Sequence, residues 1–287
     1  MISVTILTKN NARTLPNVLC MLAPFDEVLI YDTGSTDETL AIAEQYRNTV
    51  IYKGPLAGFG PTHNRASELA KNEWILSIDS DEVPSSELVD EIQNMQLQAG
   101  VVYSIPRCNY YNGKWIRGCG WYPDRVRRLY NKTETRFNDA HVHESILTTN
   151  MHEIDLKNPL NHYSYTCLSE FIAKMQAYSD LFAQQCRGKR SSSPCKAALH
   201  ASYAFIKSYF LQRGIFDGYE GFTISSYNAM TAFYKYLKLY EANKLLKTRR
   251  CPEENASLPT EAKGNQPYPS TSLRTPQSKR TGYNVTR

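Results

Sequence analysis

Two aspartates separated by a single residue, Asp79 and Asp81, directly follow the apolar run 74–78. If that run is a strand, both carboxylates can converge on one divalent cation. Mg²⁺ or Mn²⁺ favours such oxygen ligands and commonly shares its coordination shell with phosphate oxygens. Acidic turns are also common on protein surfaces, so the pair alone is a weak signal. Its place after a fully apolar run favours a metal site over a solvated turn.

A further carboxylate, Asp32, ends an earlier apolar run, and Gly34 behind it permits a tight turn. Asp32 can accept hydrogen bonds from a base or a ribose, or it can merely cap the next helix together with Ser35. No G-x-G-x-x-G pattern follows the first apolar run, so a dinucleotide-binding Rossmann site is not expected.

One polar stretch contains Asp139, His141, His143 and Glu144. A carboxylate beside an imidazole can act as a general base, can hold a metal ion together with the imidazole, or can form plain polar surface.

A glycine-flanked loop, residues 118–124, carries Trp121 and Tyr122. Exposed aromatic rings of this kind suit stacking on sugars. The alternative is that Trp121 packs inward and simply anchors the loop.

Short apolar runs alternate with helix-like segments over the first hundred residues. The alternation predicts an α/β fold with a mostly parallel central sheet flanked by helices, and ligands of such sheets bind beyond the carboxyl ends of the strands, where Asp32 and Asp79 fall. The segment 35–38 also matches a capping box. We expect strands at 2–7, 27–32, 49–53 and 74–78, and helices at 12–22, 37–46, 62–71 and 87–98.

The pattern changes after residue 100. Strands are expected at 101–106 and 125–130, a mainly helical pattern runs from 168 to 246, and the last residues are rich in Pro, Ser, Thr and basic side chains. The sequence therefore predicts an α/β domain over 1–165 with its halves meeting near 100, a helical region over 166–247, and a disordered tail over 248–287.

Charge is segregated along the chain. Residues 1–100 have a net charge of −8, residues 101–247 of +9, and residues 248–287 of +4. The positive part indicates an anionic partner such as phosphate, nucleic acid or a membrane surface, unless the clustering is chance.

Aromatic residues concentrate in 200–240, which hold seven Tyr and five Phe. Tyr and basic side chains together suit a membrane interface, although core packing would give a similar composition. Helical spacing relates Tyr227, Met230, Tyr234 and Leu237, and Lys235 and Lys238 lie close by.

Composition narrows the protein class and its compartment. Hydrophobic residues make up 41% of the chain, which excludes wholesale disorder. No apolar run reaches 18 residues, so no transmembrane helix is expected, and the first residues lack the pattern of a secretory signal. Seven scattered cysteines without a C-x-x-C pair favour a reducing compartment. A cytoplasmic protein is the expectation.

Six segments then resemble one enzyme family: ISVTILTKNN, VLIYDTGSTDET, FGPTHNRASELAKNEWILSIDSDE, GCGWYPDRVRRLY, HVHE and GIFDGYEGF. Together, and in this order over residues 1–245, they resemble glycosyltransferase family 2 enzymes with the nucleotide-diphospho-sugar (GT-A) fold. They look most like the lipopolysaccharide core β-glucosyltransferase subfamily. His63 departs from the pattern, because that subfamily usually has Lys or Arg before Asn-Arg. The tail from Thr248 onward matches nothing in the family.

The resemblance implies an inverting transfer of a hexose, most simply glucose from UDP-glucose, to a lipid A–core type acceptor at the inner leaflet. It implies a GT-A domain over 1–165, with a nucleotide-sugar half to about residue 100 and an acceptor half after it, and a helical region attached to the cytoplasmic face of the membrane. A divalent cation, Mg²⁺ or Mn²⁺, is implied as cofactor, and no nucleic acid as partner.

Site roles follow from the same resemblance and are expectations. Glu144 is the first choice for the general base, with Asp139 and Asp124 behind it. The nucleotide sugar would be bound by Thr8, Asn10, Asp32, Arg65 and Asp79, the metal by Asp81, Asp79 and His143, and the acceptor by Trp121, Tyr122 and Arg127.

Two alternatives stay open. A sugar nucleotidylyltransferase would need a glycine-rich basic loop after the first strand, where this chain has Thr8–Asn11. A non-catalytic glycolipid-binding protein derived from a transferase would not need the intact pair Asp79 and Asp81.

Overall fold

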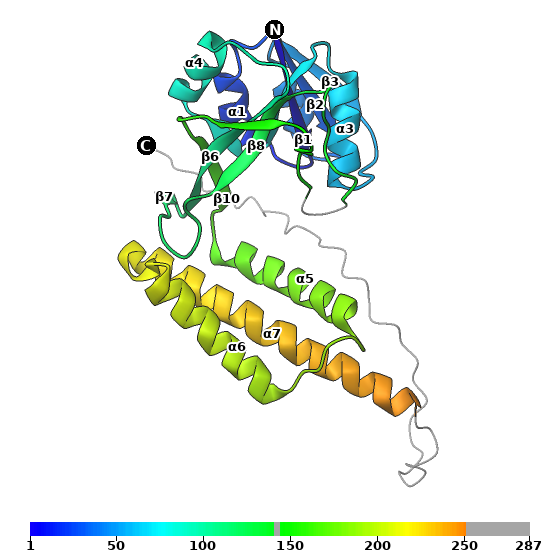
Figure 1. Ribbon diagram of the computed structural model, residues 1–287, viewed down its shortest axis with the longest axis vertical. Helices are drawn as coiled ribbons and strands as arrows, with labels where there is room; N and C mark the ends of the chain where they lie inside the picture. The colour runs from blue at the N-terminus through cyan, green and yellow to red at the C-terminus, as the bar shows by residue number, and fades with distance from the viewer. Residues whose placement is uncertain (141–143, 251–287) are drawn as a thin grey trace, which may run out of the picture. The chain divides into compact units, whose positions relative to one another are not determined.

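The computed structural model describes residues 1–140 and 144–250, and within these a ten-stranded sheet forms the core of the N-terminal part, with the helices α5, α6 and α7 below it in Figure 1. The first four strands are parallel, in the order β3-β2-β1-β4. Register pairs Thr8 with Asp32 and Leu7 with Asp79, so the predicted carboxylates lie at one edge. The strands are β1 (Ile2–Thr8), β2 (Glu27–Asp32), β3 (Thr49–Lys53) and β4 (Trp74–Asp79).

The second half of the sheet is mixed. β8 is antiparallel to β4, β6 is antiparallel to β8, and β10 runs parallel to β6. The short strand β5 follows β4 directly and pairs with β10, which places Glu82 opposite His162. The mostly parallel sheet predicted from the sequence is thus present in the first half and gives way to antiparallel pairs in the second. The bounds are β5 (Glu82–Pro84), β6 (Val101–Tyr111), β7 (Lys114–Trp115), β8 (Arg125–Asn131), β9 (His152–Asp155) and β10 (Leu160–Tyr165).

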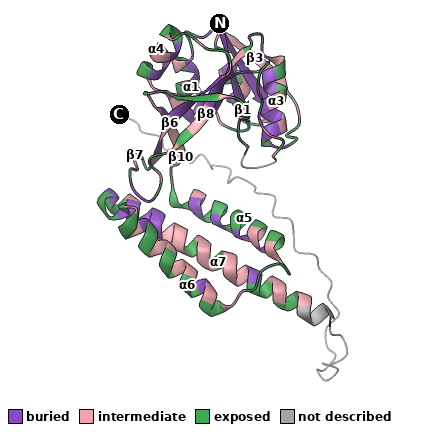
Figure 2. Ribbon diagram, in the orientation of Figure 1, coloured by how far each residue is buried: buried purple, intermediate pink, exposed green. Residues whose placement is uncertain are grey.

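Helices cover both faces of the sheet because side chains of its strands alternate between the faces. Val4, Ile6 and Ile30 pack with α1, α2 and α4 in one buried cluster, whereas Leu29 and Ile75 pack with α3 in another. Figure 2 shows the buried strands between these helices. The helices are α1 (Leu15–Met21), α2 (Thr39–Ala43), α3 (Phe59–Leu69) and α4 (Ser86–Asn94).

The capping box predicted at 35–38 is wrong. Helix α2 begins only at Thr39, and its N-cap residue Glu38 makes no capping hydrogen bond, while the Thr39 N–H donates to the Asp37 carboxylate at 3.1 Å. The Ser35 hydroxyl instead accepts a hydrogen bond from the Asn10 N–H, and Asp37 accepts one from the Ala12 N–H. The polar side chains between β2 and α2 therefore bind the loop after β1 and hold the two loops together.

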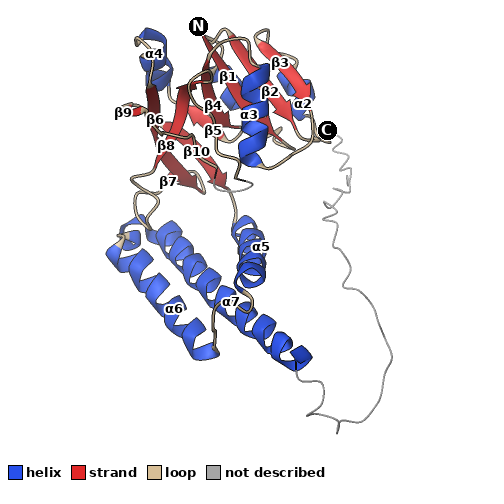
Figure 3. Ribbon diagram, turned by 45° about the vertical axis from the view of Figure 1, so that its right-hand side comes forward, coloured by secondary structure: helices blue, strands red, loops and turns tan. Residues whose placement is uncertain are grey.

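Residues 166–250 are helical (Figure 3). Residues 1–246 form one compact unit with the sheet, and of the remaining residues only the last turn of α7 is described. The tail predicted at 248–287 lies outside the described residues from residue 251 onward. No helix in the described part is long and apolar enough to cross a bilayer. The elements are α5 (Leu168–Cys186), α6 (Pro194–Ile206), η1 (Lys207–Leu211), η2 (Gly214–Asp217) and α7 (Gly218–Arg250).

Two sequence-distant motifs meet where the helical region joins the sheet. The Asp217 carboxylate accepts a hydrogen bond from the Gly118 N–H at 2.7 Å, and the Gln212 carbonyl accepts one from the Cys119 N–H at 2.8 Å. A Cβ on Gly118 would lie 2.7 Å from the Arg213 carbonyl oxygen, so only glycine fits. The loop 118–124 is thereby fixed against η1 and η2.

Helix α3 anchors the segment that leads to Glu144. Asn64 exchanges two hydrogen bonds with the backbone of Phe137, at 2.9 and 3.0 Å. The Gly60 N–H donates to the Ala140 carbonyl at 3.0 Å, and a Cβ on Gly60 would lie 1.9 Å from the Asn138 carbonyl oxygen. The glycine therefore permits the close approach of helix and loop.

His63, the departure from the family pattern, faces the protein interior. Its ring stacks on Phe137 with centroids 4.5 Å apart, and its Nδ1 lies 3.1 Å from the Ser77 hydroxyl of β4. Burial lowers the pKa of His63 to about 3, with the Arg128 charge acting in the same direction. The neutral imidazole is thus a packing residue between α3 and the sheet.

We predict that Gly60→Ala destabilises the protein. In an unobstructed helix this change would stabilise by up to about 1 kcal/mol, because alanine is the better helix former. Here the new methyl group meets a backbone carbonyl, and overpacking of that kind costs about 1–3 kcal/mol. Chemical denaturation measures the free energy of unfolding, and Glu68→Ala on the exposed side of the same helix is the control. A more stable Gly60→Ala protein would contradict the close packing described here.

Candidate active site

A cleft of about 650 Å³, called here the main cleft, opens at the carboxyl ends of β1 and β4. Thr8, Asp79, Asp81 and Glu144, four of the residues predicted from the sequence, line it together. One wall comes from α5, which contributes Lys174, Tyr178, Leu181 and Gln185. The helical region therefore forms part of the site, which the sequence did not indicate.

Asp32 and Asn10 stand behind the main cleft rather than in its lining. The buried Asp32 carboxylate accepts hydrogen bonds from the N–H groups of Gly34 and Ser35 at 3.0 to 3.2 Å. The Asn10 side chain accepts one from the Thr36 N–H at 2.7 Å. Both side chains shape the loop after β2, whose Thr33 does line the main cleft.

A buried carboxylate, Glu82, is the centre of the charge network beneath the main cleft. Arg128 donates to Glu82 at 2.6 Å and to Asp79 at 2.5 Å through the same Nη2. Arg107 donates to Glu82 at 3.0 Å and, through Nε, to Asp124 at 2.8 Å. Glu82 also accepts a hydrogen bond from the Asp79 N–H. Two guanidinium groups thus hold three carboxylates in fixed positions.

Burial and neighbouring charges shift the pKa values of Asp79 and Glu82 in opposite directions. Removal from water raises the pKa of Asp79 to about 6, and the charges of Glu82 and Asp81 add to this against the opposing charge of Arg128. Burial also acts to raise the pKa of Glu82, but Arg128, His162 and Arg107 outweigh it and hold the pKa at about 2. Glu82 is therefore the permanent anion, and Asp79 is the one whose charge responds to its surroundings.

A bulge in β8 aims Arg128 at this network. In the pairing of β8 with β6, Leu129 lies opposite Tyr103 and Arg127 opposite Ser104, so Arg128 has no partner. Such an extra residue redirects side chains locally. Arg128 consequently points inward with 7% of its side chain exposed, whereas Arg127 pairs with Glu153 and is 37% exposed.

His162 on β10 points one ring nitrogen at Asp81. The Asn109 amide donates to Asp124 and to the Trp121 carbonyl, so its oxygen is left to accept from His162 Nδ1 at 2.6 Å. His162 Nε2 lies 3.5 Å from the Asp81 carboxylate, and whenever the ring is neutral this nitrogen carries its free lone pair.

This arrangement fits a divalent cation. Two electron-pair donors facing each other need a proton or a cation between them, and a metal-bound histidine typically donates its other N–H to a neighbouring oxygen. Mg²⁺ is commonly held by one or two carboxylates together with substrate phosphates. Within the described residues no group of three or more His, Cys, Asp or Glu is arranged to hold a metal, so the remaining ligands would come from substrate and water.

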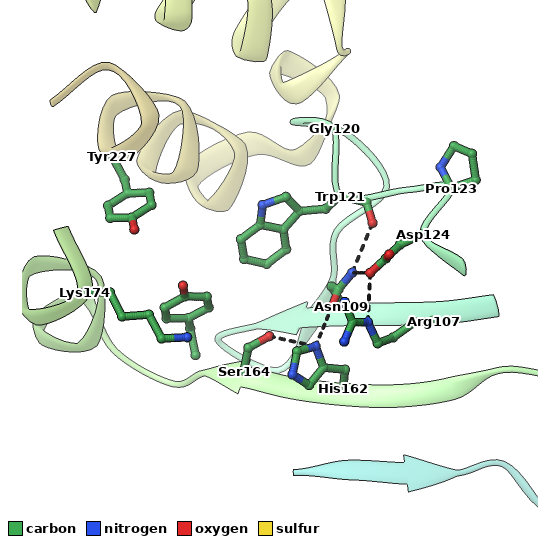
Figure 4. Close-up of a pocket in the computed structure, with 11 residues that line it drawn as sticks. Arg107, Asn109, Gly120, Trp121, Pro123, Asp124, His162, Ser164, Lys174 and Tyr227 are labelled. Carbon is green, nitrogen blue, oxygen red and sulfur yellow. Dashed lines mark hydrogen bonds and ion pairs between the residues drawn. The ribbon is translucent and has the colours of Figure 1, made fainter. Parts of the chain in front are cut away.

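A second pocket, of about 340 Å³, adjoins the main cleft and shares Arg107, His162 and Lys174 with it (Figure 4). Trp121 lines the pocket, and its ring also stacks on Tyr165 at 5.8 Å. Trp121 therefore packs inward, as the second expectation for this loop had it, and still borders a cavity, while stacking on a sugar stays a prediction. The Lys174 ammonium lies 4.2 Å from the centre of the Tyr165 ring.

The other predicted site residues lie elsewhere. Arg65 pairs with Glu68 and Asp139 with Arg136, both at the surface, while Arg127 pairs with Glu153. None of the three lines the main cleft or the second pocket. Asp124 lines the second pocket, but its carboxylate is bound by Arg107 and Asn109. Tyr122 borders a third pocket beside η1 and η2. His143 lies outside the described residues.

Five residues that the sequence did not single out complete the site: Glu82, Arg107, Arg128, His162 and Lys174. Glu82 directly follows the Asp79–Asp81 turn, which was the one available signal. The others come from β6, β8, β10 and α5, whose meeting point no local pattern reveals.

A parallel sheet with paired aspartates at its carboxyl edge, continued by strands of mixed direction, is the architecture of sugar transferases of the GT-A fold. The model of the family "Glycosyl transferase family 2" matches residues 3–151. The chain belongs to glycosyltransferase family 2.

Relatives agree with this assignment. An uncharacterized glycosyltransferase of Rickettsia bellii (strain RML369-C) is 30% identical over 260 residues, which span 84% of this chain and 86% of that protein. The lipopolysaccharide core biosynthesis glycosyltransferase LpsC of Rhizobium meliloti (strain 1021) is 25% identical over 259 residues, 85% of this chain and 93% of that protein. Among solved structures, S. aureus TarS 1-349 in complex with UDP aligns with a TM-score of 0.40 at 15% identity, over 88% of this chain and 92% of that one, too loose a match to bear on function.

We predict that the same change at two neighbouring arginines of β8 destabilises the protein to very different extents. Arg128→Gln leaves Glu82 buried without its main partner, and breaking a buried ion pair in this way costs about 3–5 kcal/mol. Arg127→Gln removes only a half-exposed pair and should cost less than about 1 kcal/mol. Denaturation curves of the two variants compare these costs directly. Equal losses would show that the inward ion pairs do not hold the site together.

Proposed function

We propose that the protein transfers a hexose, glucose in the first instance, from a nucleotide-diphosphate sugar to an inner-core type lipopolysaccharide acceptor, with inversion at the anomeric carbon. The observation that carries this proposal is that Asp79, Asp81 and Glu144 line one cleft. The relative LpsC, named for lipopolysaccharide core biosynthesis, supports the choice of acceptor.

The donor would lie along the carboxyl edge of the parallel strands. Thr8 and Thr33 border the main cleft there, with Asn10 and Asp32 shaping the loop behind them. The nucleoside would bind at this end of the cleft, and Lys9 in the lining offers a cation to its phosphates. UDP-glucose is the donor we expect.

Asp81 and His162 would hold the divalent cation, with Asp79 next to them. The cation supplies positive charge to the departing diphosphate, so no proton donor is required there. Arg128 and Glu82 keep Asp79 in place beneath the donor, and Asn109 keeps the ring of His162 in the orientation that leaves Nε2 free.

Glu144 would serve as the general base. The acceptor hydroxyl attacks the anomeric carbon, the bond from that carbon to the diphosphate oxygen breaks, and the hydroxyl proton passes to the Glu144 carboxylate. Glu144 lines the cleft close to the α3 anchor that fixes the preceding segment. Asp124, bound by Arg107, and Asp139, paired at the surface, are less suited to this task.

The acceptor would enter through the second pocket, where Trp121 offers an aromatic face and Lys174 a cation. We further propose that the enzyme works as a peripheral protein on the cytoplasmic face of the membrane. Lys235 and Lys238, which the sequence suggested as surface cations, are not free for that purpose. Lys238 binds Asp180 at 2.7 Å and Ser179 at 2.8 Å, and Lys235 lies over the ring of Phe182.

The test is incubation with a panel of UDP- and ADP-sugars, Mg²⁺ or Mn²⁺, and a lipid A–core acceptor, read by mass spectrometry. We expect an acceptor one hexose heavier with UDP-glucose, and no product after the metal is chelated. Conversion of UDP-glucose and added pyrophosphate to UTP and glucose 1-phosphate, without glycosylated acceptor, would instead indicate a nucleotidylyltransferase.

The Asp81→Ala variant, assayed in the same way, tests whether transfer depends on the proposed metal site. It removes the cleft carboxylate that faces His162, so transfer should fall to background while the fold is kept, since Asp81 is partly exposed at the cleft. Near-normal turnover in this variant would refute a metal-centred mechanism.

We predict that Glu144→Gln lowers turnover by about 10²–10⁴-fold, the usual cost of losing a general base, with little change in donor affinity. Initial rates give the first quantity and calorimetric titration with UDP-glucose the second. Asp139→Asn serves as the control, because Asp139 lies in a surface ion pair. If Asp139→Asn or Asp124→Asn alone produced the loss, the base would be assigned to the wrong carboxylate.

A further inference from the structure

Helix α6 and the turn after it present apolar side chains to solvent instead of burying them. Leu199, Tyr203, Ile206 and Phe210 recur at intervals of three and four residues and so share one side of the helix. Their exposed fractions are 72, 60, 50 and 54%. These four residues are called here the α6 face, and Figure 2 colours much of α6 as exposed.

The apolar surface continues into the turn between α6 and α7. Leu211, Ile215 and Phe216, called here the tip, are 70, 44 and 82% exposed. The opposite side of α6 and η1 carries the residues that pack inward, with Ala197 and Ser208 buried. The exposed side therefore has no partner within the described part of this chain.

Charge in this region has one sign. Residues 181–216 contain six Lys or Arg and no Asp or Glu, and the nearest carboxylates are Asp180 and Asp217. Asp217 is buried and binds the Gly118 N–H, while Asp180 is paired with Lys238. Lys207 and Arg213 are exposed beside the α6 face and the tip.

An exposed apolar stripe in a segment whose charged side chains are all cationic is complementary to an anionic lipid surface. A helix of this kind lies in the interface with its apolar side among the acyl chains and its basic side chains at the headgroups. A protein partner would be expected to meet the six cations with carboxylates of its own, and a second copy of this chain offers the same positive surface. We propose that the α6 face and the tip dock this enzyme on an anionic membrane leaflet.

The tip also borders a pocket that shares lining residues with the second pocket, and this part of the inference rests on the proposed function. The third pocket, about 730 Å³, is lined by Leu211, Arg213 and Phe216 of the turn. It shares Gly120 and Pro123 with the second pocket, which in turn joins the main cleft. A glycolipid whose lipid end stays in the leaflet at the tip would pass its sugars through these pockets toward Glu144.

The experiment is co-sedimentation of the full chain with vesicles of phosphatidylcholine alone and of phosphatidylcholine mixed with phosphatidylglycerol, without sugar nucleotide. The tip variant carries Leu211→Ser and Phe216→Ser. Its control carries Val50→Ser and Leu147→Ser, which remove exposed apolar side chains from the sheet domain. We expect the wild type and the control to bind the anionic vesicles alike, and the tip variant to bind at least about tenfold more weakly.

A second pair of variants tests how much the positive charges contribute to vesicle binding. Lys207→Gln and Arg213→Gln should each weaken binding to the anionic vesicles about fivefold and change binding to neutral vesicles little. Leu199→Ser with Tyr203→Ser tests the α6 face independently of the tip. Thermal unfolding midpoints of all variants should match the wild type, because every altered side chain is exposed.

Three results would overturn the proposal. The first is that the wild type does not bind anionic vesicles, and the second is that the tip variant binds them as well as the control does. The third is that the wild type is a dimer in solution whereas the tip variant is a monomer. Vesicle binding without sugar transfer would refute the proposed function and leave this surface intact. Transfer to a soluble acceptor by a protein that never binds vesicles would refute the surface and leave the function.

Discussion

The burial of Glu82 between Arg107 and Arg128 is the constraint on which the site depends. A carboxylate without access to water is tolerable only when its lone pairs are bound by opposite charge, and each guanidinium that binds Glu82 also binds a second carboxylate. Arg128 reaches Asp79 at the main cleft, and Arg107 reaches Asp124 at the second pocket. One buried anion thus ties the walls of the two cavities to each other.

The network depends on the change from parallel to mixed pairing after β4. Its side chains come from strands that lie far apart in the sequence. β5 returns immediately after the aspartate turn and pairs with β10, which sets His162 opposite Glu82. The bulge in β8 adds Arg128 from the other direction. Mixed strand pairing in the second half is therefore what converges these charges on Asp79 and Asp81.

The helical region is an integral part of the enzyme and not a separate appendage. α5 forms a wall of the main cleft, and η1 and η2 clamp the loop that carries Trp121. The same turn ends in the exposed tip, so the surface proposed to meet the membrane is continuous with the loop that borders the second pocket. Gly118 leaves no space for a side chain between the loop and the backbone of Arg213.

Much of the first hundred residues could be predicted from the sequence alone. The strands at 27–32 and 49–53 have the predicted bounds, and Asp32 and Asp79 lie at the carboxyl edge as expected. These are local properties, since a short β-branched run bounded by polar residues reads as a strand wherever it occurs. The predicted capping box failed because Ser35 and Asp37 bind the neighbouring loop, a partner 25 residues away in sequence.

The sequence by itself determined the class of chemistry, through the spacing of Asp79 and Asp81 after an apolar strand and the ordered set of family motifs. Only the tertiary structure decided which charged residues join that pair. Arg127 and Arg128 are adjacent residues of the same type, so the sequence does not tell their roles apart. At the bulged position in β8, Arg127 faces the surface and Arg128 faces Glu82. His162 and Lys174 likewise acquire their places from strand pairing and helix packing across long sequence separations, which periodicity within a segment cannot encode.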